Sequence, residues 1–580
     1  MIFLQRIAFI FLFSLLSVNT LPAGPLDFDT GSADTSYVDR ASQALQTRLK
    51  KADYPGLDRL YRQLFYTPVW IGRRGPTPFA KTLLQQIEKD PTIPPVLKLH
   101  EDARRLSAEL NELYRQKRPL REKIEKELEL SRLYLNYMHY LIYGGIDWPA
   151  FDAKRKELEK KYDAKVGWDY YRPGVTPSSL LVEATMSGRL SDAFRKAEPT
   201  RFHYAELKRE LIRYLRIQKR GGWKPVPAFK KSIQPGQSSP AIPRIREHLR
   251  IEGDLRGCSE PEDPQLYDEC LQEAVKRFKI RHGLSGSPVI DRRTRRWLNV
   301  PVGKKIALLR LNLDRIKWLW HKEGRIRIEL NIPAFRLYFF EGNKLIDTMR
   351  VITGRPNHPT PIFHNTMRYI VVNPYWKIPE SIVKHEMLKH LIRDPYYYER
   401  RGKILKRSWD ENSPRVDPGS VNWAQYRGKK HIPYYFMQVP GSSNALGKIK
   451  FLFPNAYSVY IHDTPTKRLF FRNQRAFSHG CMRIQKPREL LKVLALYNDN
   501  IDVDAIMERL GTKEKKTIGL KHKVPVDITY LTAFIDPYGY LNFRKDIYHY
   551  DRYQLDNYAY NPNRKQKGKK EDAPKNGEKK

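Results

Sequence analysis

The segment RNQRAFSHGCMRIQKPREL contains Cys481, one of three cysteines in the 580-residue sequence. A thiol attacks a carbonyl carbon only as the thiolate, and a free cysteine with a pKa near ~8.5 is mostly protonated at neutral pH. The side chain therefore needs a base or a positive neighbour. Two histidines are placed to serve: His462, in the segment VYIHDTP, and His479, two residues before the cysteine. This pattern predicts a cysteine nucleophile assisted by histidine.

Gly480 separates His479 from the cysteine. Glycine frees the backbone for a tight turn, in which amide groups can point inward and donate to a tetrahedral oxyanion. Two other interpretations are open. A lone cysteine can be a buried small hydrophobe, and His462, His479 and Cys481 are all zinc-ligand types. Because His-x-Cys is not a usual zinc pair and no water-activating carboxylate is evident nearby, the sequence favours the nucleophile over a metal site.

The chain begins MIFLQRIAFIFLFSLLSVNTLPAGP, in which Arg6 precedes an apolar run from Ile7 to Val18. That run is shorter than the about 20 residues that span a bilayer, and it suits a secretory signal, which we assign to residues 1–23. An uncleaved signal would associate the protein with the inner membrane. Either form predicts export to the periplasm or cell envelope.

The other two cysteines are Cys258 and Cys270, which lie close together in GCSEPEDPQLYDEC. An oxidising compartment would allow a disulfide between them. Cys481 would then be unpaired. An odd thiol in an exported protein is an intermolecular crosslinker, a buried inert residue or a reactive nucleophile.

The net charge is +42, from 106 Lys and Arg against 64 Asp and Glu. Such a field concentrates anionic partners. An exported protein seldom meets nucleic acid, so we expect no nucleic-acid partner. We expect the partner to be a polyanionic component of the cell envelope. The alternative is that the basic surface serves only solubility. Residues 561–580 are rich in lysine without apolar periodicity, which predicts a disordered basic tail.

The elements that must position the nucleophile and His462 are strands. In RIRIELNIPAFRLYFFEGNKLIDTMRVITGRP, apolar residues recur at every second position around a turn at Gly342, a pattern of strands and hairpins. Further strands are predicted at MRYIVVNP, IKFLFP and YSVYIHDT. The β region extends to about Tyr548. Residues 379–438 interrupt it with a helix and an irregular basic, aromatic stretch, typical of an insertion over one end of a sheet.

Two helical regions precede the strands. Residues 36–220 are predicted to form a mainly helical domain, in which Ile124, Leu128 and Leu135 recur at helical spacing. The stretch GGWKPVPAFKKSIQPGQSSPAIP indicates a boundary, since Pro, Gly and Ser favour turns. A small helical module at residues 239–301 follows. We therefore expect an α+β multidomain protein with a helical front and a mainly β catalytic domain.

The spacing from His462 through fifteen residues to SHGCMR, residues 478–483, resembles the signature of the YkuD-type L,D-transpeptidases. The segments VITGRPNHPTPIF, VVNPYWKIPESI and NALGKIKFLFPNAYSVYIHDTP resemble the family too, so the resemblance covers residues 326–548. With the helical front and the insertion, the order of parts resembles the large YcbB-like subgroup, whose scaffold, peptidoglycan-binding and catalytic domains are accompanied by a capping insertion.

The module at residues 239–301 carries a second set of motif residues. They are Ala274, Phe278, His282, Gly283, Leu284, Thr294, Leu298 and Asn299. This set resembles the three-helix peptidoglycan-binding modules. It departs from them at Lys279, where glutamine is usual, and at GSPVID, where a second glycine is expected.

The YkuD resemblance implies a two-step acyl transfer. Cys481 is the nucleophile, and His462 is the general base that takes its proton and later serves the incoming amine. The thiolate attacks the carbonyl of the L-centre of a meso-diaminopimelate residue and expels the terminal D-Ala. A side-chain amine of a neighbouring stem peptide then resolves the acyl-enzyme and gives a 3,3 crosslink. Backbone amides of Gly480 and Cys481 hold the oxyanion.

The same resemblance gives the neighbouring residues supporting roles. Ser478 and His479 support the loop, and Arg483 faces carboxylates of the stem peptide, as a planar charged fork can. No metal and no organic cofactor is implied. The implied partners are the stem peptides and glycan of peptidoglycan, and carbapenem β-lactams are expected to acylate Cys481. Two alternatives stay open: an L,D-carboxypeptidase with water as the acceptor, and a wall-binding protein with a degenerate catalytic domain.

Overall fold

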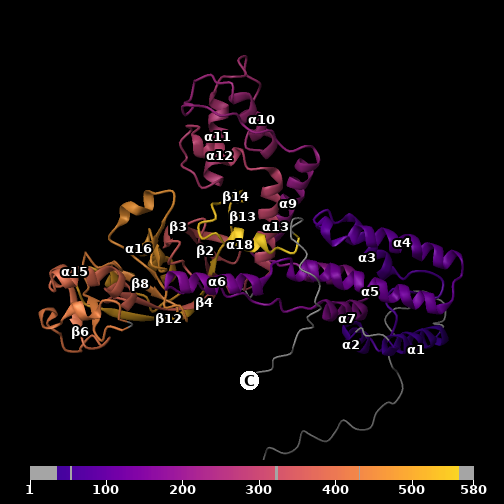
Figure 1. Ribbon diagram of the computed structural model, residues 1–580, viewed down its shortest axis with the longest axis horizontal. Helices are drawn as coiled ribbons and strands as arrows, with labels where there is room; N and C mark the ends of the chain where they lie inside the picture. The colour runs from indigo at the N-terminus through magenta and orange to yellow at the C-terminus, as the bar shows by residue number, and fades with distance from the viewer. Residues whose placement is uncertain (1–34, 52–54, 321–323, 430, 561–580) are drawn as a thin grey trace, which may run out of the picture. The chain divides into compact units, whose positions relative to one another are not determined.

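The computed structural model describes most of the chain from Thr35 to Tyr560 (Figure 1). The described ranges are 35–51, 55–320, 324–429 and 431–560. The signal segment 1–23 and the tail 561–580 lie outside these residues. The chain divides into two compact units, each of which is described by itself below.

The first unit comprises Met1–Gly144 and Pro173–Glu198, and its described part is helical. Its helices are α1 (Thr35–Lys51), α2 (Pro55–Gln63), α3 (Pro78–Lys89), α4 (Leu99–Arg115), α5 (Leu120–Tyr143), α7 (Pro177–Ser187) and α8 (Leu190–Lys196). The 24-residue α5 contacts α1, α2, α3, α4 and α7, since apolar residues at three- and four-residue steps are buried along it. Its buried Glu127 accepts the backbone amides of residues 69–71, which fixes the loop before α3.

The second unit comprises Gly145–Arg172 and Pro199–Lys580 and, among the described residues, is built on a nine-stranded sheet. The strands are β1 (Ile326–Asn331), β2 (Arg336–Glu341), β3 (Lys344–Gly354), β4 (Phe363–Val372), β8 (Ile449–Leu452), β9 (Ile461–His462), β10 (Ala476–Ser478), β11 (Met482–Ile484) and β12 (Lys516–Thr529). Their order is β10-β3-β11-β9-β8-β4-β12-β1-β2, and β2 also pairs with β3, so the sheet closes on itself. The predicted α+β class, with a mainly β domain after a helical front, is confirmed.

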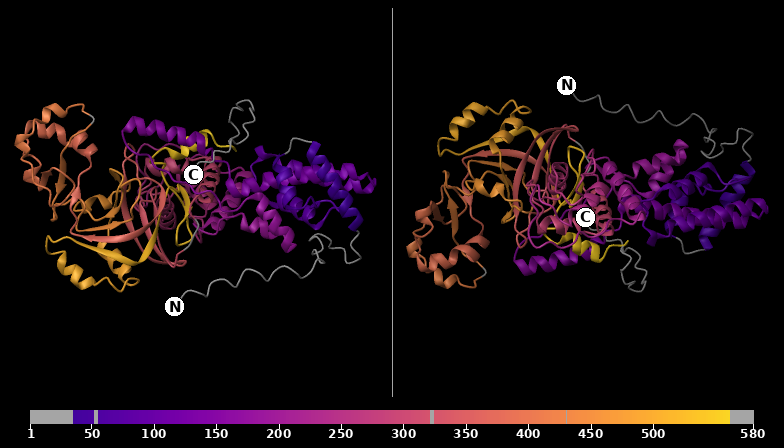
Figure 2. Two further views of the ribbon diagram at one scale, coloured as in Figure 1. Left: turned by 90° about the horizontal axis from the view of Figure 1, so that it is seen from below. Right: turned by 90° about the horizontal axis from the view of Figure 1, so that it is seen from above.

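Helices of the second unit accompany this sheet, and Figure 2 shows α6 beside the strands in both views. They are α6 (Trp148–Tyr162), α9 (Tyr204–Lys219), α13 (Val302–Lys317), α16 (Pro487–Ala495), α17 (Val503–Arg509) and α18 (Tyr550–Asp556). Trp148 and Phe151 are buried in one core with strand residues such as Ile328. α6 and α9 fall within residues 36–220, the range predicted as one helical domain, and belong to the second unit. For α6 the reason is the apolar area that its two aromatic side chains bury among the strands.

Residues 239–301 contain three helices of the second unit, α10 (Ile242–Glu252), α11 (Glu269–Arg281) and α12 (Arg292–Leu298). A disulfide joins Cys258 to Cys270, whose Cα atoms are 6.1 Å apart. The fully buried Glu252 forms an ion pair with Lys305 of α13, which ties this module to the rest of the unit. Two further strands, β13 (Ala533–Ile535) and β14 (Leu541–Phe543), form a separate hairpin.

The segment between β4 and β8 folds around a small sheet of its own, and it contains the insertion expected at residues 379–438. Its strands, in the order β5-β7-β6, are β5 (Trp376–Lys377), β6 (Lys403–Lys406) and β7 (Tyr435–Gln438). Its helical part consists of α14 (Glu380–Ile382), a π-helical turn (Val383–Met387) and α15 (Leu388–Arg393). Leu391, Trp423 and Phe436 belong to a hydrophobic cluster of this segment. Short 3₁₀ turns complete the chain at Pro95–Leu97, Glu399–Arg401, Pro418–Ser420, Trp423–Tyr426 and Lys467–Phe471.

None of the helices in the described ranges combines the length and apolarity needed to cross a lipid bilayer.

Candidate active site

The predicted base lies on β9 of the closed sheet, and the predicted nucleophile directly precedes the neighbouring strand β11. β9 and β11 run parallel, and their register pairs Met482 with Ile461 and Arg483 with His462. Ile461 and Met482 are fully buried in the core. Side chains alternate between the two faces of a strand. The face of β9 and β11 away from that core therefore carries His462 and Arg483, while Cys481, which directly precedes β11, packs against the core.

A hydrogen-bonded loop between β10 and β11 presents Cys481. Ser478 Oγ donates to the carbonyl oxygen of Cys481 (2.6 Å) and accepts from the amide of Gly480 (3.2 Å). Thr360 Oγ1 donates to the Gly480 carbonyl (2.8 Å). Gly480 has a φ of +111°, a conformation that other residues rarely adopt. The Gly480 amide, which the resemblance assigned to an oxyanion, is thus engaged within the loop.

The thiol of Cys481 is the free thiol of the chain and is half-buried. Burial raises the pKa of this thiol, because a thiolate is poorly solvated there. The backbone amide and hydroxyl of Tyr460 and the charges of Lys450 and Arg483 act in the opposite direction. Burial prevails, so the neutral thiol predominates at neutral pH.

His462 is buried, with 3% of its surface exposed, and its Nδ1 lies 2.5 Å from the carbonyl oxygen of Asp463. A carbonyl oxygen can only accept, so Nδ1 carries the proton and Nε2 keeps its lone pair. Burial, and after it the charge of Arg483, lowers the pKa of His462 to about 3. His462 is therefore neutral, and the strand register places it opposite Arg483, two residues after Cys481.

Two further side chains of the site were not identified from the sequence. The backbone amide and the hydroxyl of Tyr460 act to lower the pKa of the Cys481 thiol, which places Tyr460 beside it. Lys450 of β8 is paired with His462 in the strand register, and its Nζ lies 3.7 Å from the centre of the Tyr460 ring. Tyr460 could have been found, because residues two apart on a strand share a face and it stands two before His462. Lys450 could not, since only the pairing of β8 with β9 brings it to the site.

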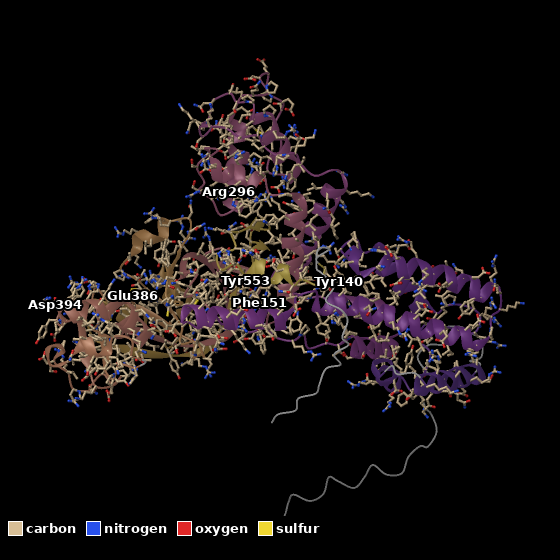
Figure 3. The ribbon with its side chains drawn as sticks, in the orientation of Figure 1. Tyr140, Phe151, Arg296, Glu386, Asp394 and Tyr553 are labelled. Atoms are coloured by element: carbon tan, nitrogen blue, oxygen red, sulfur yellow. A yellow bond between two sulfur atoms is a disulfide. The ribbon has the colours of Figure 1, made fainter. Side chains whose placement is uncertain are left out.

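His479 is directed toward the insertion. Its Nε2 lies 2.7 Å from Glu386 Oε1 and 2.7 Å from an Arg355 guanidinium nitrogen, and its ring meets that of His358 edge-on at 4.9 Å. Glu386, labelled in Figure 3, comes from the π-helical turn of the insertion. Burial lowers the pKa of His479, while Glu386 opposes that shift. His479 thus connects the insertion to the loop that bears Cys481.

Arg483 is a half-buried cation beside the base. Its Nε is buried and has no hydrogen-bond partner in the described part of the chain. Burial lowers the pKa of the guanidinium. Such a group is suited to a carboxylate that arrives with a substrate. Among the described residues, no three His, Cys, Asp or Glu side chains gather in a way that could hold a metal ion.

Comparison with known proteins assigns two regions of the chain. Residues 325–527 match the L,D-transpeptidase catalytic domain of the YkuD family, and residues 39–211 match the Scaffold domain family. A Haemophilus influenzae protein named "Putative L,D-transpeptidase" is 34% identical over 301 residues, which cover 51% of this chain and 58% of that protein. The match thus spans less than two thirds of the relative's length.

Solved structures of L,D-transpeptidases are also similar. One from Stackebrandtia nassauensis is 11% identical, with a TM-score of 0.20 and coverage of 53% of this chain and 96% of that chain. The LD transpeptidase LdtMt1 in complex with imipenem is 11% identical, with a TM-score of 0.16 and coverage of 35% and 59%. Within this chain, residues 325–527 are thus similar to the L,D-transpeptidase catalytic domain of the YkuD family, and residues 39–211 are similar to the Scaffold domain.

Proposed function

We propose that this protein is an exported peptidoglycan L,D-transpeptidase that forms 3,3 crosslinks between meso-diaminopimelate residues of stem peptides. One arrangement carries the proposal: Cys481 directly precedes β11, and β11 pairs in parallel with β9, which carries the neutral, buried His462, inside the match to the YkuD domain. The sequence-predicted signal at residues 1–23 and the net charge of +42 support a place in the periplasm or cell envelope, with inner-membrane association if the signal is uncleaved.

The first step acylates the enzyme. The Sγ proton of Cys481 passes to Nε2 of His462 while the sulfur attacks the carbonyl carbon of the donor stem peptide. A C–S bond forms and the carbonyl oxygen becomes an oxyanion. Tyr460, whose hydroxyl acts to lower the pKa of the Cys481 thiol, would be the side-chain donor beside that oxyanion. The C–N bond to the terminal D-Ala then breaks, and the departing amine takes the proton from His462.

The second step transfers the acyl group. The side-chain amine of a neighbouring stem peptide attacks the thioester carbonyl and gives up a proton to His462, which is neutral again. The C–S bond breaks, and the thiolate of Cys481 recovers the proton from His462. The new amide bond is the 3,3 crosslink. Water in place of the amine would release a tripeptide, which is the L,D-carboxypeptidase reaction.

Substrate recognition is proposed for three parts of the second unit. The Arg483 guanidinium, whose Nε is buried without a partner in the described chain, would bind a stem-peptide carboxylate. The insertion at residues 379–438, linked to the nucleophile loop through Glu386, would cover the bound peptide. The three-helix module at residues 239–301 would hold glycan. The proposed reaction needs neither a metal nor an organic cofactor.

Products formed from purified disaccharide-tetrapeptides, identified by mass spectrometry, test the proposal. Dimers with a 3,3 linkage are expected, and the matched Cys481→Ala variant should form none. Tripeptides without dimers would assign the carboxypeptidase reaction instead. Neither product from the unaltered protein would contradict the proposal and favour a wall-binding role.

Carbapenem acylation gives a second, substrate-independent test. We expect a mass adduct of one carbapenem on the unaltered protein and none on Cys481→Ala, because the thioester forms by the same attack. An unaltered protein that stays free of adduct would show that the thiol is not reactive.

A further inference from the structure

Lys450 is a cation without a carboxylate partner beside the nucleophile. Its position in β8 places it opposite His462 of β9, with Nζ 3.7 Å from the centre of the Tyr460 ring. Among the described residues, neither an ion pair nor a hydrogen bond of Nζ is found. Burial lowers the pKa of Lys450 to about 8, and Cys481 acts against that shift. A half-buried charge of this kind is costly unless some anion compensates it.

Tyr460 connects Lys450 with the thiol. One face of its ring carries the ammonium group, its ring and that of His462 meet in a T-shaped arrangement at a centroid distance of 5.6 Å, and its hydroxyl acts to lower the pKa of the Cys481 thiol. A cation is attracted to the negative face of an aromatic ring, which fixes the plane of the ring. Lys450 thus helps to set the direction in which the Tyr460 hydroxyl points.

The proposed reaction would produce an anion that can compensate the charge of Lys450. The charged groups that act on Lys450 from neighbouring elements are Lys377 and Lys515, which add charge of the same sign. The carboxylate of Glu386 is already bonded to His479 and Arg355. The thiolate of Cys481, and the oxyanion that follows it, are therefore the negative charges that form next to the lysine. Attraction between charges is weakly screened in a partly buried site.

We propose that Lys450 is the fixed positive partner of the anion that forms at Cys481, and that it acts through Tyr460, whose ring it holds against the nucleophile. The inference rests on the proposed function, which makes Cys481 the nucleophile. Lys450 is then a positioning residue, while His462 remains the base.

Alkylation of Cys481 by iodoacetamide, followed as a function of pH, tests this without any substrate. The disulfide between Cys258 and Cys270 leaves Cys481 as the thiol that reacts. Lys450→Met should slow alkylation near neutral pH roughly tenfold, which corresponds to a rise of about one unit in the thiol pKa. The limiting rate at high pH should not change. Lys450→Arg keeps the charge and should stay within about threefold of the unaltered protein.

Lys448→Met is the matched control, because Lys448 lies two residues before Lys450 and its amine bonds the Leu510 carbonyl. Slow alkylation of Lys450→Met with a normal rate for the control supports the proposal. A Lys450→Met profile that superimposes on that of the unaltered protein overturns it, as does equal slowing in both variants. A raised KM for stem peptides with unchanged alkylation would also overturn it, since Lys450 would then bind substrate.

The path through Tyr460 has its own test. In a Tyr460→Phe background, Lys450→Met should slow alkylation less than it does alone, because the hydroxyl that links the ring to the thiol is gone. An undiminished effect would contradict this path. Circular dichroism checks the fold of each variant, and Lys450→Gln replaces Lys450→Met if the latter does not fold. If Lys450→Met shifts the alkylation profile but the unaltered protein forms neither 3,3-linked dimers nor tripeptides, the proposed function is contradicted and the role of Lys450 beside Cys481 is not.

Discussion

Cys481 and His462 form a neutral pair in the resting protein. Burial raises the pKa of the thiol and lowers the pKa of the imidazole to about 3, and each shift disfavours the charged form of its group. A preformed thiolate–imidazolium pair would need the opposite shifts. In the proposed reaction the proton would therefore move from sulfur to His462 Nε2 during the attack itself, and the Asp463 carbonyl would hold the ring in the tautomer that can accept it.

This neutral pair predicts the pH dependence of carbapenem acylation. With a folded-state pKa of about 3, His462 is already deprotonated well below neutral pH, so the amount of competent base is constant there. The acylation rate, measured from the growth of the mass adduct, should be flat from about pH 5 to about pH 7 and should fall only on further acidification. An inflection near pH ~6.5, the ordinary histidine value, would contradict the neutral pair.

The two histidines are predicted to differ in their effect on the same reaction. His462→Ala should slow acylation by about 10²- to 10⁴-fold, the usual contribution of a general base. His479→Ala should slow it less, because His479 Nε2 is bonded to Glu386 and Arg355 and serves the shape of the loop. The Cys481→Ala variant gives the background rate of the acylation assay. Full activity of His462→Ala would show that another group takes the proton.

The sequence alone predicts those residues of this site that belong to one motif. Cys481 and His462 stand at a spacing that resembles the family signature, and the prediction of their roles needs no knowledge of the sheet. Lys450 and Tyr460 become neighbours of the thiol through the pairing of β8, β9 and β11, and no local period encodes which strands pair. The contact of Glu386 with His479 joins residues 93 positions apart, across an insertion whose fold the sequence leaves irregular.

At the scale of elements, Glu386 couples the insertion to the nucleophile loop. It lies on a π-helical turn, a feature frequent at functional sites. Its carboxylate contacts His479 at 2.7 Å and Arg355 at 3.1 Å. With 42% of the side chain exposed, the ion pair contributes about 0–1 kcal/mol. Such a contact can hold the insertion against the loop and still be broken when substrate enters.

Loss of this contact should loosen the loop that bears Cys481. In Glu386→Gln, we expect hydrogen exchange of residues 476–484 to speed up by about two- to fivefold, in line with the weak pair. The matched control is Asp394→Asn, which removes an acidic group that pairs with Arg400 in the same insertion and is labelled with Glu386 in Figure 3. Equal exchange rates in the two variants would show that Glu386 does not hold the loop.

For the whole molecule, periodicity locates the helical front and the longer strands because both patterns are local. The division into units is not local. In sequence, α6 lies between α5 and α7 of the first unit, yet Trp148 and Phe151 are buried among strands that lie much later in the chain. β9, β10 and β11, which frame the site, have only two or three residues each, too few for alternation to reveal. The motif between them, rather than their pattern, marks the site.

The net charge of +42 predicts how the whole chain associates with an anionic wall. Binding to insoluble peptidoglycan, measured by co-sedimentation with Cys481→Ala to prevent covalent capture, should weaken strongly between about 0.1 M and about 1 M salt, as the screening length falls from ~10 Å to ~3 Å. Sucrose at matched osmolality is the control.

The segment 561–580 has eight basic and three acidic residues, so its net charge of +5 (8 − 3) is a small share of the total net charge. Removal of this segment should therefore reduce binding to peptidoglycan only slightly. Binding that does not change with salt concentration would show that uncharged contacts recognise the wall. Loss of most of the binding when residues 561–580 are removed would contradict an electrostatic attraction that is spread over the chain.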